Sequence, residues 1–163
     1  MSDAPEIIIR LAGPADAPSL ARLRYEFRSG HDPATEDEAD FLARCGAWMA
    51  ARLAPGSPWR CWVAEDAGRL VGAIWLQFIE KIPNPGAEAE KHGYISNLYV
   101  EPSRRGDGLG SMLIDTCVRF CEKEAVDAMI LWPTPRSRPL YERHGFAVRD
   151  DLLERRMDPI PSH

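Results

Sequence analysis

The sequence lacks any long hydrophobic run and any basic leader segment. Its apolar stretches are far shorter than the roughly 18 consecutive apolar residues that cross a membrane. The first ten residues carry two acids before the short run Ile7 to Ile9, whereas a secretory signal begins with basic residues and continues into a longer apolar core. We therefore expect a cytoplasmic protein that does not bind a membrane.

An excess of positive charge is also missing. The chain has 25 Asp and Glu residues against 20 Lys and Arg residues, which gives a formal net charge of −5. A negative field repels polyanions, so the sequence argues against a nucleic-acid partner and favours a neutral or cationic substrate.

Cysteine and histidine are sparse and show no metal-ligand spacing. The chain has four of each and no C-x-x-C pair, and Cys117 and Cys121 stand one helical turn apart on an apolar face. We expect reduced thiols in the core and no metal site.

The residues that are present are those of an ordinary globular domain. The 163 residues are 45% hydrophobic and 28% charged, so we expect a single domain over 1–163, with its core at about 6–157. The turn 66–68 predicts an antiparallel hairpin between its flanking runs. Hydrophobic periodicity predicts strands near 6–11, 59–65, 69–79, 92–100 and 128–132, one or two more within 146–157, and helices near 17–29, 36–53, 108–124 and 137–144.

A glycine-rich stretch joins the expected strand 92–100 to the long helix after it. Gly106, Gly108 and Gly110 alternate with other residues and follow two arginines, Arg104 and Arg105. Glycine allows backbone conformations and close approaches that a Cβ forbids, and a helix N-terminus adds unpaired N–H groups and a partial positive charge. Together these features predict an anion site.

Two familiar phosphate-binding patterns do not fit this stretch. A P-loop needs a Gly-Lys pair followed by Ser or Thr, and the sequence has no such run. A dinucleotide fingerprint needs G-x-G-x-x-G and an acid that closes the second strand, whereas the spacing here is G-x-G-x-G and Asp127 precedes its strand. A tight turn without a ligand remains open as an alternative.

The third pattern is R-x-x-G-x-G, which runs from Arg105 to Gly110. Here the sequence resembles the GNAT superfamily of N-acetyltransferases, whose members use this turn to hold the pyrophosphate of acetyl-coenzyme A. The wider family pattern V-x-P-x-x-R-G-x-G is matched from Val100 to Gly108, and the run L-Y-E-R-H-G-F from Leu140 to Phe146 resembles the family's tyrosine-bearing helix and the strand after it.

The resemblance implies an α/β (α+β) fold, with a mostly antiparallel, V-splayed sheet of six or seven strands flanked by about four helices. It also implies acetyl-coenzyme A as cosubstrate. The pantetheine arm would pair with the strand before the turn, and the phosphates with the turn itself, where the Asp107 side chain would point outward. The residues implied in cofactor binding are Leu98, Tyr99, Val100, Arg105, Gly106, Asp107, Gly108, Leu109, Gly110, Ser111, Thr134 and Ser137.

The same resemblance implies direct acetyl transfer to an amine. Tyr141 matches the family tyrosine that donates a proton to the departing thiolate. The glutamate that some members use as a base falls at Tyr94 here, so Glu80 and His92 are the remaining candidates, acting directly or through water. For both candidates an ordinary surface or structural role is the competing interpretation.

The acceptor is expected to be a primary amine of a small molecule or peptide. Two acid-rich segments, 31–40 and 83–91, occupy the acceptor-facing regions of such folds, which would favour a cationic amine; solvated surface acids are the alternative. The resemblance adds a homodimer through the C-terminal strands as a further expectation. Because the base is missing, a non-catalytic acyl-coenzyme A binding or regulatory domain is the rival function, and a nucleotide-binding domain of another class is a more distant one.

Overall fold

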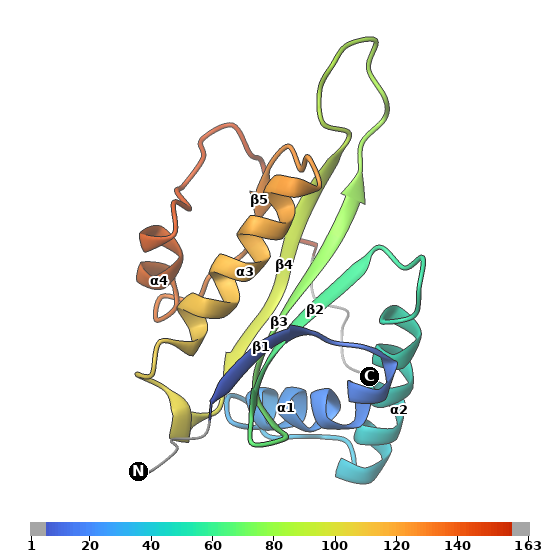
Figure 1. Cartoon of the computed structure of the whole chain (residues 1–163), viewed down its shortest axis with the longest axis vertical. Coiled ribbons are helices and arrows are strands. Elements are labelled where there is room, and N and C mark those ends of the chain that lie inside the picture. The colour runs from blue at the N-terminus through green and yellow to red at the C-terminus, as the bar shows by residue number, and fades with distance from the viewer. Residues whose placement is uncertain (1–5, 158–163) are drawn as a thin grey trace.

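The protein forms one five-stranded sheet with helices on both faces (Figure 1). The structure is a computed structural model that describes residues 6–157. The elements in chain order are β1 (Ile7–Leu11), η1 (Pro14–Asp16), α1 (Ala17–Ser29), α2 (Glu38–Arg52), β2 (Trp59–Asp66), β3 (Arg69–Glu80), β4 (Lys91–Val100), η2 (Pro102–Arg104), α3 (Leu109–Lys123), β5 (Met129–Ile130) and α4 (Arg138–Arg143).

The strands lie side by side in the order β1-β2-β3-β4-β5. The pairs from β1 to β4 are antiparallel, and β4 and β5 run parallel. The expected hairpin between β2 and β3 is confirmed, because Ala67 and Gly68 both take positive φ angles, 48° and 82°. This is the turn geometry that matches the natural twist of two antiparallel strands.

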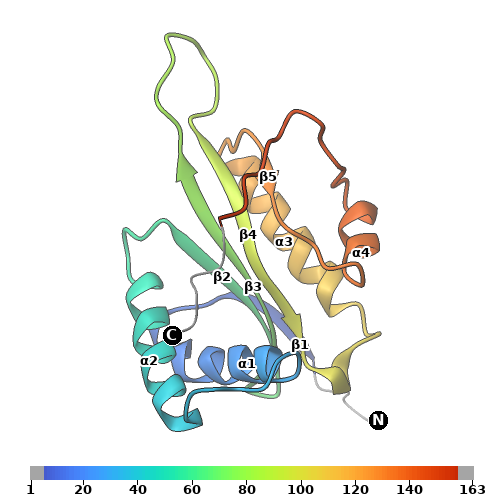
Figure 2. The same ribbon diagram turned by 180° about the vertical axis from the view of Figure 1, so that it is seen from behind.

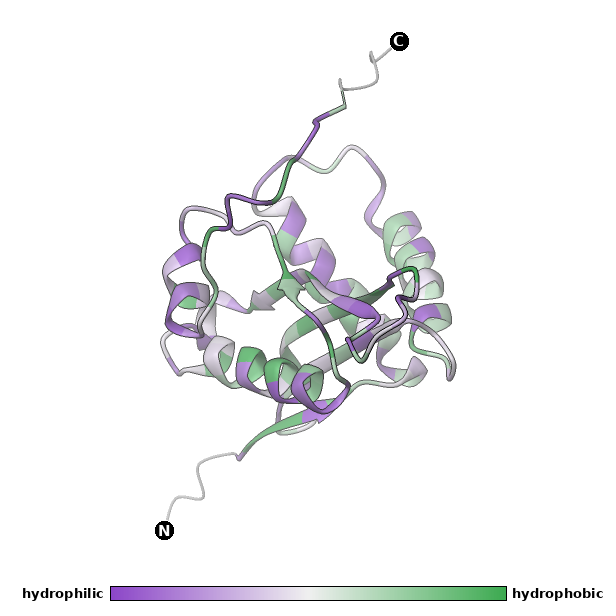
Figure 3. Ribbon diagram, turned by 90° about the horizontal axis from the view of Figure 1, so that it is seen from above, coloured by the Kyte–Doolittle hydropathy of each residue, from purple (hydrophilic) through white to green (hydrophobic). Residues whose placement is uncertain are grey.

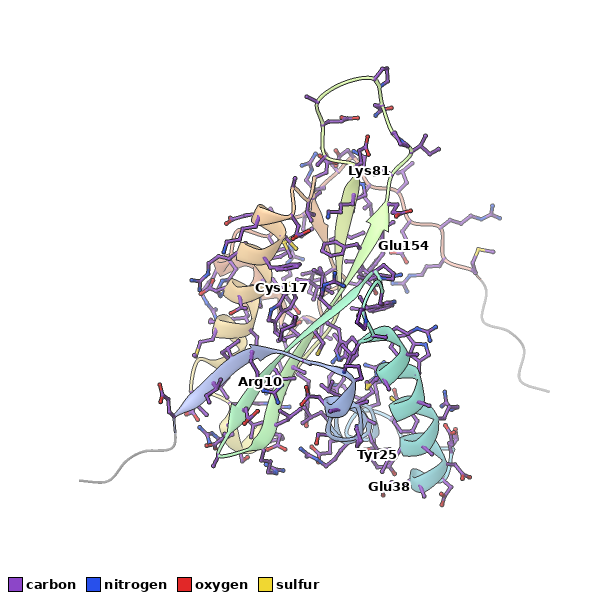
Figure 4. The ribbon with its side chains drawn as sticks, turned by 45° about the vertical axis from the view of Figure 1, so that its right-hand side comes forward. Arg10, Tyr25, Glu38, Lys81, Cys117 and Glu154 are labelled. Carbon is purple, nitrogen blue, oxygen red and sulfur yellow. The ribbon has the colours of Figure 1, made fainter. Side chains whose placement is uncertain are left out.

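The two faces of the sheet carry different helices. α1 packs against α2 and on β3 and β4, whereas α3 crosses β2, β3 and β4 on the other face and supports α4 (Figures 1 and 2). Cys117 lies on the side of α3 that is turned toward the sheet (Figure 4), and Cys117 and Cys121 are buried free thiols, as expected.

β3 is the central strand and supplies both hydrophobic layers. Its buried residues alternate, so that Ala73 and Trp75 belong to the α1 and α2 side while Ile74 and Leu76 belong to the α3 side. Each fully buried large side chain contributes about 2 kcal/mol to folding. Apolar colour accordingly gathers between the sheet and the helices when the molecule is seen from above (Figure 3).

The C-terminal segment differs from the expectation. Residues 146–157 were expected to form one or two strands, but no strand forms there, so the sheet has five strands rather than six or seven. β5 is only two residues long and offers little backbone for another strand to pair with. Charges also interrupt the segment and pair locally, as Arg149 does with Asp151, and Leu153 is 96% exposed.

No helix among residues 6–157 is long and apolar enough to cross a bilayer. No group of three or more His, Cys, Asp or Glu side chains in that range is arranged to hold a metal ion.

Glu101 joins three elements at the end of β4. Its carboxylate is buried and accepts two hydrogen bonds of 2.7 Å from Arg69, at the start of β3, and one of 3.0 Å from Arg22 on α1. Burial by itself would raise the pKa of Glu101, but the hydrogen bonds from Arg69 and Arg22 outweigh it and lower the pKa below its ordinary value.

We expect Glu101→Gln to lower the free energy of unfolding at pH 7 by about 3 kcal/mol, because the substitution leaves two arginines without their carboxylate. Since the folded pKa is depressed, the stabilisation is complete above the unfolded pKa and disappears as the pH falls through the folded value. Urea unfolding at pH 7 and at pH 4 measures both effects. The exposed pair variant Asp151→Asn should cost less than about 0.5 kcal/mol, and equal losses for the two variants would contradict the assignment.

Candidate functional site

The turn between β4 and α3 is built on two glycines with left-handed backbone angles. Gly106 has φ 88° and Gly108 has φ 79°, and a Cβ on either would meet no atom within 4 Å. The conformation, rather than space, therefore requires glycine. Gly110 was expected to share this role, but it lies inside α3 without a positive φ. A Cβ there would approach the Leu140 side chain to 3.2 Å, so Gly110 allows α4 to pack closely on α3.

The first turn of α3 leaves backbone donors unused. Gly108 is the N-cap and has no side chain to satisfy them, and the first helical hydrogen bond runs from Met112 N to Gly108 O over 3.1 Å. Within the described residues, the N–H groups of Leu109, Gly110 and Ser111 have no hydrogen-bond acceptor. Such a helix end attracts anions through its N–H groups and its dipole.

The structure separates the two arginines of the turn. Arg104 forms ion pairs with Asp66 and, over 3.0 Å, with Asp107, so its charge is already compensated. Arg105 has no carboxylate partner among residues 6–157. Its Nε donates to Val100 O over 3.0 Å and its guanidinium lies over the Tyr99 ring at 5.7 Å.

β4 contains a bulge, and beyond Tyr94 it is no longer paired with β5. Trp75 pairs with Asn97 and Leu76 pairs with Ile95, so the bulge leaves Ser96 without a partner on β3. On the opposite side, β5 pairs only with Gly93 and Tyr94. From Ile95 to Val100, the backbone groups that face away from β3 have no strand partner in the described part of the chain. An extended ligand could pair with this open edge.

Tyr141 is buried on the α3 side of the sheet. It is 6% exposed and its ring stands edge-on to Phe146, with centroids 5.6 Å apart. Burial, followed by the proximity of Cys117, raises the pKa of Tyr141 to about 12. The phenol is therefore protonated at neutral pH and can donate a proton.

The two hydroxyls expected near the cofactor bond to each other. Thr134 Oγ1 and Ser137 Oγ are 3.0 Å apart, and the Ser137 hydroxyl also accepts from Thr134 N over 3.0 Å. The helix begins after Ser137 as expected, but that hydroxyl caps the preceding loop rather than α4.

The base candidates lie away from the bulge. His92 is four residues before Ser96, about 13 Å along an extended strand, and its Nδ1 is 3.7 Å from Asp127 Oδ2 without a hydrogen bond. Glu80 is exposed at the end of β3, opposite Lys91. Both candidates lie at the end of the sheet that is near Lys81 in Figure 4. Neither belongs to the buried cluster on the α3 side that contains Tyr141.

A cavity of about 380 Å³ opens on the α1 and α2 face of the sheet, beside the bulge. Residues from α1, α2, β2, β3 and β4 line it: Arg24, Phe41, Arg44, Cys45, Trp48, Met49, Trp59, Trp75, Ser96 and Asn97. This cavity could not be predicted from the sequence, because the spacing of the α2 residues is equally typical of a core-facing stripe.

Trp132, at the end of the expected strand 128–132, does not line the cavity. Its ring packs edge-on against Tyr94 at 5.3 Å, and its Nε1 donates to Glu154 over 3.2 Å. Glu154 lies on the C-terminal segment that passes beside β3 and β4 (Figure 4).

The acid-rich segments do not contribute carboxylates to this cavity. Glu36 accepts hydrogen bonds from Arg44, and Asp37 caps the start of α2. The loop 83–91 extends from the far end of the sheet (Figure 1). No Asp or Glu in the described part of the chain lines the cavity, so the expected preference for a cationic amine has no support there.

Comparison with known proteins agrees with these features. The profile of the Acetyltransferase (GNAT) family matches residues 19–146. A glucosamine 6-phosphate N-acetyltransferase from Trypanosoma brucei brucei is 31% identical over 86 residues, which are 53% of this chain and 56% of that protein. The chain therefore spans about half the length of this curated relative.

Two solved structures share the fold over most of the chain. A GCN5-related N-acetyltransferase from Ralstonia eutropha JMP134 has 28% identity and a TM-score of 0.72, covering 92% of this chain and 98% of that one. A predicted acetyltransferase with acetyl-CoA from Clostridium acetobutylicum has 24% identity and a TM-score of 0.72, covering 93% and 96%.

We expect Gly108→Ala to lower the free energy of unfolding by about 1 kcal/mol, because alanine is strained at a positive φ even where space is open. Gly86→Ala is the matched control: a Cβ there also meets open space, and its φ is not in the left-handed region. Chemical denaturation of the two variants and the parent compares them, and a Gly108→Ala protein as stable as the control would show that the turn is not strained by a side chain.

Proposed function

This chain belongs to the acetyltransferase (GNAT) family, and we propose that it transfers an acetyl group from acetyl-coenzyme A directly to a primary amine. The observation that carries the proposal is the unpaired edge of β4 leading straight into a glycine turn with three free N–H groups. An open strand edge suits the amides of a pantetheine arm, and the helix end suits a pyrophosphate.

The residues around the turn fit the donor in distinct ways. We propose that the backbone from Gly106 to Ser111 binds the phosphates and that Arg105 adds a charge. The Asp107 carboxylate is held by Arg104 over 3.0 Å, which leaves the Asp107 backbone N–H as the group for the anion. The Thr134 and Ser137 hydroxyls, and the backbone of Leu98, Tyr99 and Val100, would contact the pantetheine arm.

Burial keeps the Tyr141 hydroxyl protonated, which suits it to donate a proton. In the proposed reaction the free amine attacks the thioester carbonyl, and the nitrogen loses its extra proton to water as the carbon–sulfur bond breaks. The Tyr141 hydroxyl gives its proton to the sulfur and regains one from solvent. Backbone N–H groups near the β4 bulge would polarise the carbonyl oxygen.

The acceptor ammonium must also lose a proton. Among residues 6–157, no histidine or carboxylate lines the cavity. We therefore propose that water removes this proton, with His92 as a more distant acceptor on the face of β4 that carries Ser96. Glu80 is the weaker candidate because it is exposed at the end of its strand.

A homodimer is a further part of the proposal. Val148 and Leu153, on the C-terminal segment, are 74% and 96% exposed, which supplies apolar surface for a second copy.

We expect Tyr141→Phe to lower kcat for amine-dependent release of coenzyme A by about 100-fold, because the leaving sulfur loses its proton donor. The dissociation constant for acetyl-coenzyme A should stay within about twofold. Since the pKa of Tyr141 is about 12, its deprotonation should not reduce kcat of the parent between pH 6 and pH 9.

Tyr25→Phe on α1 is the control and should retain the parental kcat. Full turnover by Tyr141→Phe would remove the proton-donor assignment. Tight binding of acetyl-coenzyme A by the parent, without release of coenzyme A for any amine tested, would instead favour a non-catalytic acyl-coenzyme A binding domain.

The two arginines of the turn should respond differently to substitution. We expect Arg105→Met to raise the dissociation constant for acetyl-coenzyme A about 10-fold, because a charge-assisted contact to phosphate is lost. Arg104→Met should leave that constant within about twofold, since Arg104 is already paired with Asp66 and Asp107. Isothermal titration of both variants measures this, and equal weakening would contradict the separation.

A further inference from the structure

The cavity beside the β4 bulge has an unusual charge for its size. Two arginines line it, Arg24 from α1 and Arg44 from α2, and no acidic side chain of the described residues does. The whole chain has a net charge of −5, so the local sign is opposite to that of the molecule. A cationic acceptor would meet repulsion here.

Only one of these arginines is free to receive a ligand. Arg44 donates to both carboxylate oxygens of Glu36, over 3.1 Å and 2.6 Å, and its side chain is 66% exposed. Arg24 forms no ion pair within residues 6–157. Its Nη1 donates to Asn97 Oδ1 over 3.1 Å, and its guanidinium lies 5.8 Å from the centre of the Phe27 ring.

Arg24 stays positively charged without a carboxylate partner among residues 6–157. Burial, followed by the charge of Arg28, lowers the pKa of the Arg24 guanidinium below its ordinary value. An arginine nevertheless stays charged in a protein. A half-buried charge without a counterion costs free energy, and an anion that binds there offsets this cost.

Aromatic side chains supply four of the other eight lining residues, three of them tryptophans. Trp48 and Trp59 meet edge to face with ring centres 5.2 Å apart, and Trp75 lies 6.2 Å from each of them. Trp48 is 39% exposed, so part of this cluster is open to a ligand rather than consumed by the core. Aromatic faces of this kind bind apolar or planar groups.

We propose that the acceptor is a primary amine that carries its own anionic group, a carboxylate or a phosphate, which Arg24 binds, and an apolar or planar body that packs on Trp48 and Trp59. This rests on the proposed acetyltransfer and names the substrate class of the same site.

The position of Arg24 also orients the acceptor. Asn97, which accepts the hydrogen bond from Arg24, follows the bulge residue Ser96, and both line the cavity floor. Since Arg24 contacts Asn97 over 3.1 Å, an anion at Arg24 keeps a short acceptor within reach of the bulge, where the thioester carbonyl is proposed to lie. Arg24 is therefore a specificity residue that positions the acceptor rather than a group that reacts.

Matched pairs of amines test this proposal. L-phenylalanine is compared with L-phenylalaninamide, and glucosamine 6-phosphate with glucosamine, by kcat/KM for coenzyme A release. We expect the anionic member of at least one pair to be about 10- to 100-fold better. If only the phenylalanine pair shows a preference, the anionic group that Arg24 binds is a carboxylate. If only the glucosamine pair does, that group is a phosphate. Equal rates within both pairs, or a preference for spermidine over all four, would overturn the proposal.

Variants of Arg24 assign the preference to this residue. Arg24→Met should abolish the preference by raising KM for the anionic amine while leaving its neutral partner and the affinity for acetyl-coenzyme A within about twofold. Arg24→Lys keeps the charge and should restore part of the preference. Arg28→Met removes an exposed arginine one turn along α1 and should change nothing. An undiminished preference in Arg24→Met would overturn the proposal.

Direct titration separates this inference from the proposed function. The anionic amines are titrated into the parent and into Arg24→Met in the presence of coenzyme A, without any turnover. Binding that depends on Arg24 supports the inference even if no acetyl transfer occurs, in which case only the proposed function fails. Acetyl transfer to amines that does not depend on Arg24 would overturn this inference and leave the proposed function standing.

Discussion

The short contact between β4 and β5 is the constraint on which the site depends. A strand inside a sheet has all its backbone groups paired, and β4 is paired on both sides only at Gly93 and Tyr94. Beyond that point one edge is open, and the bulge at Ser96 re-aims the strand just where the edge becomes free. The glycine turn and the cavity both begin from this unpaired half of β4, one at its end and the other at its bulge.

The glycine turn and the cavity have the same arrangement of charged side chains. At the turn, Arg104 is compensated by Asp66 and Asp107, while Arg105 has no acid within the described residues. At the cavity, Arg44 is compensated by Glu36, while Arg24 has no acidic partner among residues 6–157. Each location thus presents one available cation next to one that helps to hold the structure. The donor and the proposed acceptor both carry anionic groups, which suits this arrangement.

The parts of the site that are local in sequence could be predicted, and those assembled from distant segments could not. The hairpin at Ala67 and Gly68 and the glycine turn follow from backbone angles that few residues adopt. Arg24, Trp48 and Trp59 come from three elements, and each alone resembles an ordinary amphipathic or strand residue. Their shared cavity arises only when α1 and α2 pack on β3, which no spacing along the chain encodes.

Other differences have equally local causes. Residues 146–157 were expected to form one or two strands, but a strand also needs a partner, and β5 offers only two residues. Acids in 31–40 were expected to face the acceptor, yet Glu36 and Asp37 pair with an arginine and a helix start, the nearest unsatisfied groups. Sequence gives the charge of a side chain, and its partner is decided by packing.

Glu101 links helix α1 to the start of the glycine turn. Its buried carboxylate connects Arg22 on α1 with Arg69 at the start of β3, and Glu101 itself stands between β4 and the glycine turn. Releasing α1 from the sheet therefore breaks the same contact that fixes the beginning of the turn. We therefore expect helix α1 and the turn to open together in local unfolding, although they lie about 80 residues apart in the chain.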